Sequence, residues 1–103
     1  MLIKKGNKYI KAVKSPKQLE RHLKGAANHR RIEILFLVAR AKGINVENIA
    51  EKLNVNFKTI SEHTRRLEQA GLIRKSHKGR TVMHELSPYG KIIYNFLMTF
   101  QYS

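Results

Sequence analysis

Cysteine and aspartate are both absent from this chain of 103 residues. Without cysteine, the chain cannot form disulfides, thiolate metal sites or cysteine nucleophiles, and this composition fits a reducing compartment. Ser61 and His63 point roughly 200° apart on a helix, so they cannot form a nucleophile–base pair. The sequence also has no glycine-rich phosphate loop and no carboxylate pair on one face. We therefore expect a protein that is not an enzyme and needs no cofactor.

Long apolar segments are also missing. No run approaches the roughly 18 apolar residues of a membrane-spanning helix. The first residues, MLIKKGNKYIKAVK, lack the apolar core and cleavage site of a signal peptide. We expect a cytoplasmic protein without a membrane partner, and the length indicates one folded domain.

Positive charge is present in large excess. The chain has 21 Lys and Arg against 7 acidic residues, all Glu, which gives a formal net charge of +14 and a pI near 10.5. Such a balance is typical of proteins that bind a polyanion. Because a ribosomal or otherwise basic surface has the same composition, the positions of the charges must decide.

Residues 45–71 predict two short amphipathic helices separated by a tight turn. Asn45 is placed to cap the first helix and Asn56 the second, and Gly71 ends the pair. Ile60, Thr64 and Leu67 share one face of the second helix, which is the buried face by this pattern. The opposite face is polar and basic, with Lys58, Thr59, Ser61, Glu62, Arg65 and Arg66.

Two helices are predicted before this pair, after a basic arm over residues 1–14. The arm carries five lysines, a turn at Gly6-Asn7 and a short strand or helical turn over residues 9–13. Ser15-Pro16-Lys17-Gln18 is a capping box with Pro at the first helical position. Asn28 caps the next helix, whose wide apolar stripe predicts the most buried helix and which we expect to end at Lys42-Gly43.

Residues 72–87 change to a period of two, which predicts a β-hairpin with Lys78-Gly79-Arg80 at its tip. Ser87-Pro88 then opens a last helix. This helix carries more apolar surface than a small core can cover. We therefore expect it to mediate dimerisation, although a helix packed only on its own domain has the same pattern.

Four motifs in this order resemble winged helix-turn-helix repressors of the ArsR family, with MarR-like features in the wing and last helix. Asn28-His29-Arg30-Arg31-Ile32-Glu33-Ile34-Leu35 is similar to the D-P-x-R-x-x-I-L run of the second helix. The segment from Leu53 to His63 is similar to the L-x-[LV]-S-x-x-T-[VI]-S-x-H entry to the recognition helix. Ala70-Gly71-Leu72-Ile73 matches the A-G-L-[VI] lead into the wing. Gly79-Arg80 followed by Glu85-Leu86-Ser87-Pro88-Tyr89-Gly90 resembles the G-R…Y-x-L-T-x-x-G passage.

The resemblance implies a mainly α (α+β) fold, a winged helix-turn-helix with about five helices and a two-stranded β-hairpin wing. The domain would span residues 15–103. It also implies a DNA-binding transcriptional regulator, which we expect to act as a repressor and as a homodimer on double-stranded DNA. The Cys-x-Cys motif of metal-sensing relatives is missing, as are histidines on the last helix, so we predict no metal site and the small-molecule effector stays unknown.

In this geometry the second helix of the pair enters the major groove by its N-terminal half. Lys58 suits guanine and Glu62 suits a cytosine amino group, while Arg65 and Arg66 would contact the backbone. The full predicted recognition-helix set is Asn56, Phe57, Lys58, Thr59, Ser61, Glu62, Arg65 and Arg66. The predicted wing set is Lys75, His77, Lys78, Gly79 and Arg80, of which Arg80 is the best single candidate for a groove or phosphate contact.

Two further sets complete the predicted sites. Arg30 and Arg31 lie in the first turn of a helix, where the dipole disfavours cations, so we expect weaker DNA contacts from them. The predicted dimerisation residues are Leu19, Leu23, Tyr89, Ile93, Phe96, Leu97 and Phe100.

Other functions of the same sequence stay open. The lysines of the N-terminal arm favour an architectural, chromatin-like protein that coats DNA without sequence preference. A winged helix can also dock protein or RNA within a larger assembly. For metal binding, His77 and His84 could approach each other across the hairpin, but two ligands alone make a poor site.

Overall fold

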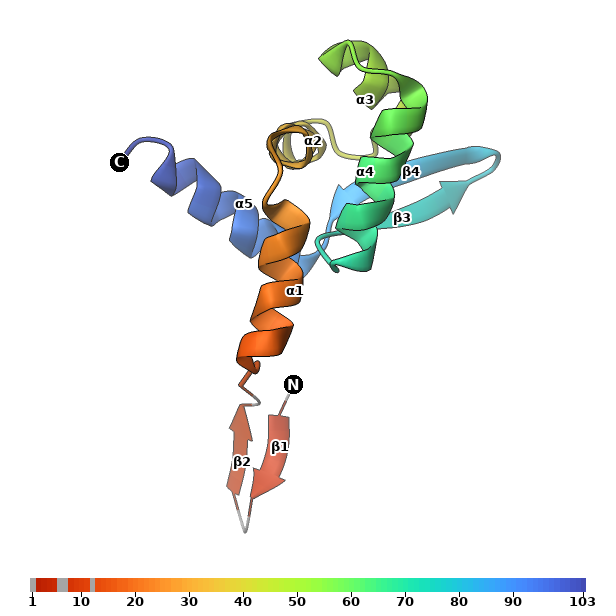
Figure 1. The fold of residues 1–103 in the computed structure, drawn as a ribbon. Coiled ribbons are helices and arrows are strands. Elements are labelled where there is room, and N and C mark those ends of the chain that lie inside the picture. Colours follow the sequence, from red (N-terminus) through yellow and green to blue (C-terminus); the bar gives the residue numbers. More distant parts are fainter. Residues whose placement is uncertain (1, 6–7, 12) are drawn as a thin grey trace.

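The computed structural model describes residues 2–5, 8–11 and 13–103, and this part of the chain contains five helices and two antiparallel hairpins (Figure 1). The order of the elements from α1 to α5 confirms the predicted winged helix-turn-helix fold. Among the described residues, no helix combines the length and apolarity that a membrane span requires.

The N-terminal hairpin is formed by β1 (Leu2–Lys5) and β2 (Lys8–Lys11), which pair antiparallel with Ile3 opposite Ile10. It lies beyond the N-terminal end of α1, away from the helical body (Figure 1). The predicted short strand within residues 9–13 corresponds in part to β2. The turn predicted at Gly6-Asn7 lies outside the described residues.

Helix α1 (Pro16–Ala26) begins with the predicted capping box, in which Ser15 Oγ accepts from the Gln18 N–H at 3.2 Å and Gln18 Oε1 accepts from the Ser15 N–H at 2.8 Å. Helix α2 (His29–Arg40) is capped by Asn28 as predicted. Its predicted end at Lys42-Gly43 is wrong, because α2 ends at Arg40 and Ala41 caps it. Gly43 has a φ of +83° and its N–H donates to the His84 carbonyl. Gly43 therefore contacts the wing and does not end the helix.

The hydrophobic core is centred on α2, as its wide apolar stripe predicted. Ile34 and Leu35 are completely buried, together with Ile49 of α3 (Val46–Leu53) and with Ile60 and Leu67 of α4 (Phe57–Gln69). Burying such a side chain contributes roughly 1.5–3 kcal/mol. Because α3 and α4 share this core, the orientation of the helix pair is fixed by apolar packing.

The turn between α3 and α4 depends on asparagine. Asn54 adopts the left-handed conformation with φ of 53°, which asparagine tolerates better than most residues. Asn45 Oδ1 accepts from the Asn48 N–H at 2.8 Å and caps α3, and Asn56 caps α4. Both predicted caps are confirmed.

The wing consists of β3 (Ile73–Lys78) and β4 (Thr81–Leu86), in register from Ile73 opposite Leu86 to Lys78 opposite Thr81. The predicted three-residue tip is one residue too long, because Lys78 is paired and only Gly79-Arg80 forms the turn. Gly79 has a φ of +63°, whereas Arg80 does not have a positive φ. This pattern is that of a type II′ hairpin turn, which needs Gly at its first central position.

Helix α5 (Pro88–Phe100) is capped by Ser87 as predicted. It crosses the end of α4 and the start of β3 very closely: a Cβ on Gly90 would lie only 1.9 Å from the Leu72 carbonyl oxygen. Only a glycine fits at this crossing. From there α5 extends away from the body of the domain (Figure 1).

Candidate nucleic-acid interface

Helix α4 presents one face to the core and the other to solvent. Ile60, Thr64 and Leu67 are buried with exposures of 0%, 5% and 0%, which confirms the predicted inner face. On the outer side, the structure exposes every predicted recognition residue except Ser61, which is half-buried. Within the described part of the chain, the outer face of the helix is therefore accessible to a partner.

The N-terminal end of α4 is ordered by its own cap. Asn56 Oδ1 accepts from the Lys58 N–H at 2.7 Å and from the Thr59 N–H at 3.4 Å. The side chains of Lys58 and Thr59 point outward from the first turn, where the helix dipole is positive. This end of the helix therefore combines a cation, a hydroxyl and the positive end of a dipole, which suits an anionic partner.

Glu62 is held between two arginines further along the same face. Its Oε1 accepts from Arg65 Nη2 at 2.6 Å and from Arg66 Nε at 3.1 Å. These hydrogen bonds hold the pKa of the Glu62 carboxyl below its usual value. All three side chains are solvent-exposed, so the pairs themselves add little to stability. They do orient the guanidinium groups before any partner binds.

The wing places its predicted residues on two faces. Lys75 and His77 pair with His84 and Val82, whereas Lys78 pairs with Thr81 on the other side of the ribbon. Lys75 Nζ lies 3.7 Å from Glu68 Oε1 of α4, so one of the predicted wing cations faces the helix. All five predicted wing residues are exposed.

The wing turn and the start of α4 line one groove of about 320 Å³. Phe57, half-exposed as the first residue of α4, and Arg80 in the turn both contribute to its walls. The remaining lining residues come from the start of α3 and from β4: Asn45, Val46, Glu47, Thr81, Val82 and His84. The sequence did not predict this groove, because its walls are far apart in the chain.

Arg30 and Arg31 are both used within the protein. Arg30 Nη1 donates to Glu33 Oε1 at 3.1 Å. Arg31 Nε donates to the Gly25 carbonyl at 2.6 Å and its Nη2 to the Lys24 carbonyl at 3.4 Å. These carbonyls lie at the C-terminal end of α1, where a cation is favourable. Arg31 lies at the start of α2, where the helix dipole disfavours a cation, but it donates hydrogen bonds to the last carbonyls of α1, and these explain its position.

The model of the MarR family matches residues 27–80, just over half of the 103 residues. This match covers α2, the helix-turn-helix, β3 and the wing turn. The chain belongs to the MarR family. No curated protein matches it.

Solved structures agree with this assignment. Reduced HlyU from Vibrio cholerae N16961 is 25% identical over 82% of this chain and 88% of that chain, with a TM-score of 0.73. A second neighbour is the homodimeric winged helix-turn-helix DNA-binding domain Mb0332 from Mycobacterium bovis, a possible ArsR-family regulator. It is 24% identical over 88% of this chain and 90% of that chain, with a TM-score of 0.75. Streptococcus pneumoniae FabT, solved in complex with DNA, is 15% identical over 82% of this chain and 66% of that chain, with a TM-score of 0.67. At this identity the likeness supports a shared fold and nothing more.

These findings establish the general class of this MarR-family chain. It is homologous to transcriptional regulators of the winged-helix, DNA-binding type, and neither the family nor the fold is that of an enzyme. The matches also fit both halves of the predicted resemblance, since ArsR-family and MarR-type proteins occur among the structural neighbours.

The predicted dimerisation residues of this MarR-family chain fall into two groups. Leu19, Leu23, Tyr89, Phe96 and Phe100 are exposed by 45–63%. Ile93 and Leu97 are partly buried and pack against the domain's own core. Ile92, which the prediction left out, is 64% exposed. Helices α5 and α1 therefore both carry exposed apolar side chains.

The histidines do not gather into a metal site. In the register of the wing, His77 faces Val82 and His84 faces Lys75, so the two histidines are not opposite each other. His84 is buried, with Nδ1 3.1 Å from the Ile44 carbonyl. Within residues 13–103, no three metal-binding side chains come together.

Two histidines connect α4 to its surroundings in ways the sequence did not reveal. His22 of α1 is buried, and its Nδ1 donates to the Ala70 carbonyl at the end of α4 at 2.6 Å. His63 lies beside Arg31, whose Nη1 approaches its Nδ1 to 3.5 Å. Burial, followed by the Arg31 charge, lowers the pKa of His63. The only sequence signal was a histidine on a helix face, which is not specific.

Proposed function

We propose that this chain binds double-stranded DNA sequence-specifically as a homodimer and represses transcription by occupying promoter DNA in the cytoplasm. The observation that carries the proposal is the groove shared by α4 and the wing, which brings Phe57 and Arg80 to one surface. A recognition helix such as α4 can bind in the major groove of a duplex, while a basic hairpin turn beside it contacts the neighbouring phosphates.

Base recognition is assigned to the first two turns of α4. Lys58 and Thr59 are exposed there, and the Asn56 cap fixes the helix end that carries them. Lys58 suits the guanine O6 and N7 acceptors, and Glu62 suits a cytosine amino group. Arg65 and Arg66, held by Glu62, suit the phosphate backbone.

The homodimer is assigned to the exposed apolar surface of α5 and α1. Phe96 and Phe100 are 55% and 63% exposed, although they lie next to each other with ring centroids 5.5 Å apart. Aromatic groups of this size favour burial against a partner. The homodimeric Mycobacterium bovis relative supports a dimer of this kind.

The DNA-binding surface is tested by Lys58→Ala and Arg80→Ala, with Lys91→Ala on α5 as the matched control. Binding to a duplex selected from a random pool is measured over a salt series. Wild-type affinity should fall steeply with salt, and each of the two interface variants should bind about tenfold more weakly, with a salt slope smaller by about 0.9 for each lost phosphate contact. Affinity that does not change with salt, or equal losses in all three variants, would contradict this surface.

The dimer is tested by the mass in solution. Phe96→Glu places a charge on the proposed interface and should convert the dimer to a monomer that keeps its helical content. Asn95→Glu, at an exposed neighbouring position on α5, should leave the dimer intact. A wild-type protein that stays monomeric at micromolar concentration would refute the dimer.

A further inference from the structure

Phe57, the first residue of α4, has an exposed apolar side chain within the proposed DNA surface. Its exposed fraction is 52%. Within residues 24–88, all of which the structure describes, it is the only large apolar side chain that is exposed, and the others lie in or next to α1 and α5. A single exposed apolar residue is ordinary on a protein surface, so the surroundings of Phe57 must decide what it does.

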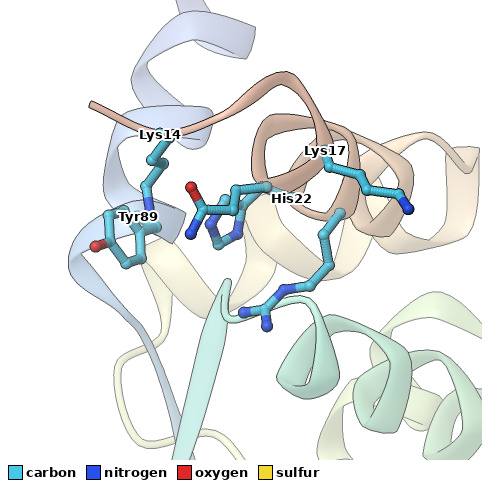
Figure 2. A pocket seen from close by; sticks show the side chains of 6 residues that line it. Lys14, Lys17, His22 and Tyr89 are labelled. Carbon is cyan, nitrogen blue, oxygen red and sulfur yellow. The ribbon is translucent and has the colours of Figure 1, made fainter. Parts of the chain in front are cut away.

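Three other exposed aromatic rings have ring neighbours in the protein. The Tyr89 ring lies 5.0 Å from the His22 ring in the pocket between α1 and the start of α5 (Figure 2). The rings of Phe96 and Phe100 are 5.5 Å apart. Within the described part of the chain, Phe57 forms no ring pair of this kind. Its ring is therefore available to an external partner.

Phe57 lies in a groove that combines apolar surface with a cation. It lines the groove shared by α4 and the wing, together with Arg80 of the wing turn. Val46 and Val82, both half-buried, add apolar surface to the same groove. The Asn56 side chain caps α4 and thereby holds the backbone beside Phe57. The start of α4 therefore offers an apolar ring in a restrained position, with a cation in the same groove.

A phenylalanine ring can recognise one base edge in the major groove and disfavours the others. The edges of guanine, adenine and cytosine present hydrogen-bonding atoms there, whereas thymine also presents an apolar group, its 5-methyl. A ring placed over a polar edge removes its water without replacing the hydrogen bond, which costs affinity. A ring placed against the methyl group buries apolar surface on both sides.

We propose that Phe57 recognises a thymine through its 5-methyl group and so determines one base of each half-site. This inference rests on the proposed DNA-binding function and deepens it, because it names the base that this residue selects. Arg80, in the same groove, holds a phosphate near that thymine. Lys58, the next residue, reads guanine by hydrogen bonds, so the two base contacts are chemically independent.

The inference is tested on the wild-type protein by removing the methyl group from the DNA. A duplex is selected from a random pool, and each thymine is then replaced in turn by deoxyuridine, which lacks only the 5-methyl group. Affinity, measured by fluorescence anisotropy, should fall about three- to tenfold at one thymine of each half-site, the loss expected for one methyl group. At that position a 5-methylcytosine–guanine pair should bind more tightly than a cytosine–guanine pair, since it restores the methyl group.

Phe57→Ala and Lys58→Ala form a matched pair of variants, and both should bind the selected duplex more weakly. In Phe57→Ala the loss caused by deoxyuridine at that thymine should disappear, because both changes remove the same contact. In Lys58→Ala the full loss should remain, and Phe57→Leu, which keeps an apolar side chain, should retain part of it. Because both residues are exposed, all three variants should keep the helical content of the wild type in circular dichroism.

Two results would overturn the inference alone. One is a selected duplex whose affinity responds to deoxyuridine at no position, and the other is a methyl effect of equal size in Phe57→Ala and Lys58→Ala. Equal affinity for selected and random duplex would overturn the proposed function and this inference with it. Tighter binding of the single strand than of the duplex would do the same, and would indicate that the ring stacks on an unpaired base.

Discussion

Glu62 lies between Arg65 and Arg66 on the exposed face of α4, with carboxylate–guanidinium distances of 2.6 and 3.1 Å. Such exposed pairs add little to stability, so their main effect is on the surface that a partner meets. The carboxylate orients both guanidinium groups and at the same time lowers the positive charge of the helix. A change at Glu62 should therefore affect the affinity for DNA and the preference for one DNA sequence in opposite directions.

Replacing Glu62 by Gln should raise affinity for random duplex DNA by roughly two- to fivefold, because a negative charge near the phosphates is removed. Affinity for a selected operator should rise less, since a cytosine contact is lost. The ratio of the two affinities, measured by competition, should therefore fall. Glu51→Gln on α3 is the control, and an equal loss of both affinities in Glu62→Gln would indicate a purely structural role.

We expect His63 to make the stability of the protein depend on pH. Its pKa is lowered in the folded state by burial and by Arg31, so between the folded and unfolded pKa values the unfolded chain binds more protons. The contribution of His63 to the free energy of unfolding is fully present above its pKa in the unfolded chain. It is lost as the pH falls through its lower pKa in the folded protein.

Lowering the pH from about 7.5 to about 5.5 should therefore decrease the free energy of unfolding more in the wild type than in His63→Asn. The effect is small because His63 is only partly buried. Urea unfolding at both pH values measures the difference. The same pH dependence in both proteins would contradict this role for His63.

At the scale of elements, the fold depends on close crossings at glycine. Besides the contact of Gly90 with Leu72, a Cβ on Gly25 of α1 would lie 2.2 Å from the Cβ of Ala70 at the end of α4. Both crossings converge on the segment that joins α4 to β3. This junction therefore positions α1, α4 and α5 relative to the wing.

Gly90→Ala tests the crossing of α5 over β3. In an exposed helix this change would stabilise by up to about 1 kcal/mol. Here the methyl group meets backbone, which cannot easily move, so we expect a loss of roughly 1–3 kcal/mol in the free energy of unfolding. Chemical denaturation, with Asn95→Ala on the exposed side of α5 as control, measures it. A stabilised Gly90→Ala protein would mean that the crossing is loose.

The elements were predictable where their signals are local. The caps at Ser15, Asn28, Asn45, Asn56 and Ser87 each act within a few residues, and all five are confirmed. The end of α2 was predicted too late because Gly43 serves a contact with His84, about forty residues further on. The contacts of Arg31 and His22 were missed for the same reason, since their partners are set by packing and not by spacing.

For the whole molecule, the charge and the motif order predicted the class of protein, and the family match agrees with it. The groove shared by Phe57 and Arg80 was not predictable, nor was the pocket lined by Lys14, Arg21 and Tyr89. Each is lined by segments that only the tertiary fold brings together. The DNA-binding, wing and dimerisation residues themselves stay predictions.

The most direct test of the proposed function is the ratio of affinities for a selected operator and for random duplex DNA. It is measured by fluorescence anisotropy competition at about 0.15 M salt, where non-specific phosphate contacts are weakened. A sequence-specific regulator should show a ratio of about 10³ or more. A ratio near one would contradict the proposal and indicate a protein that coats DNA without reading it.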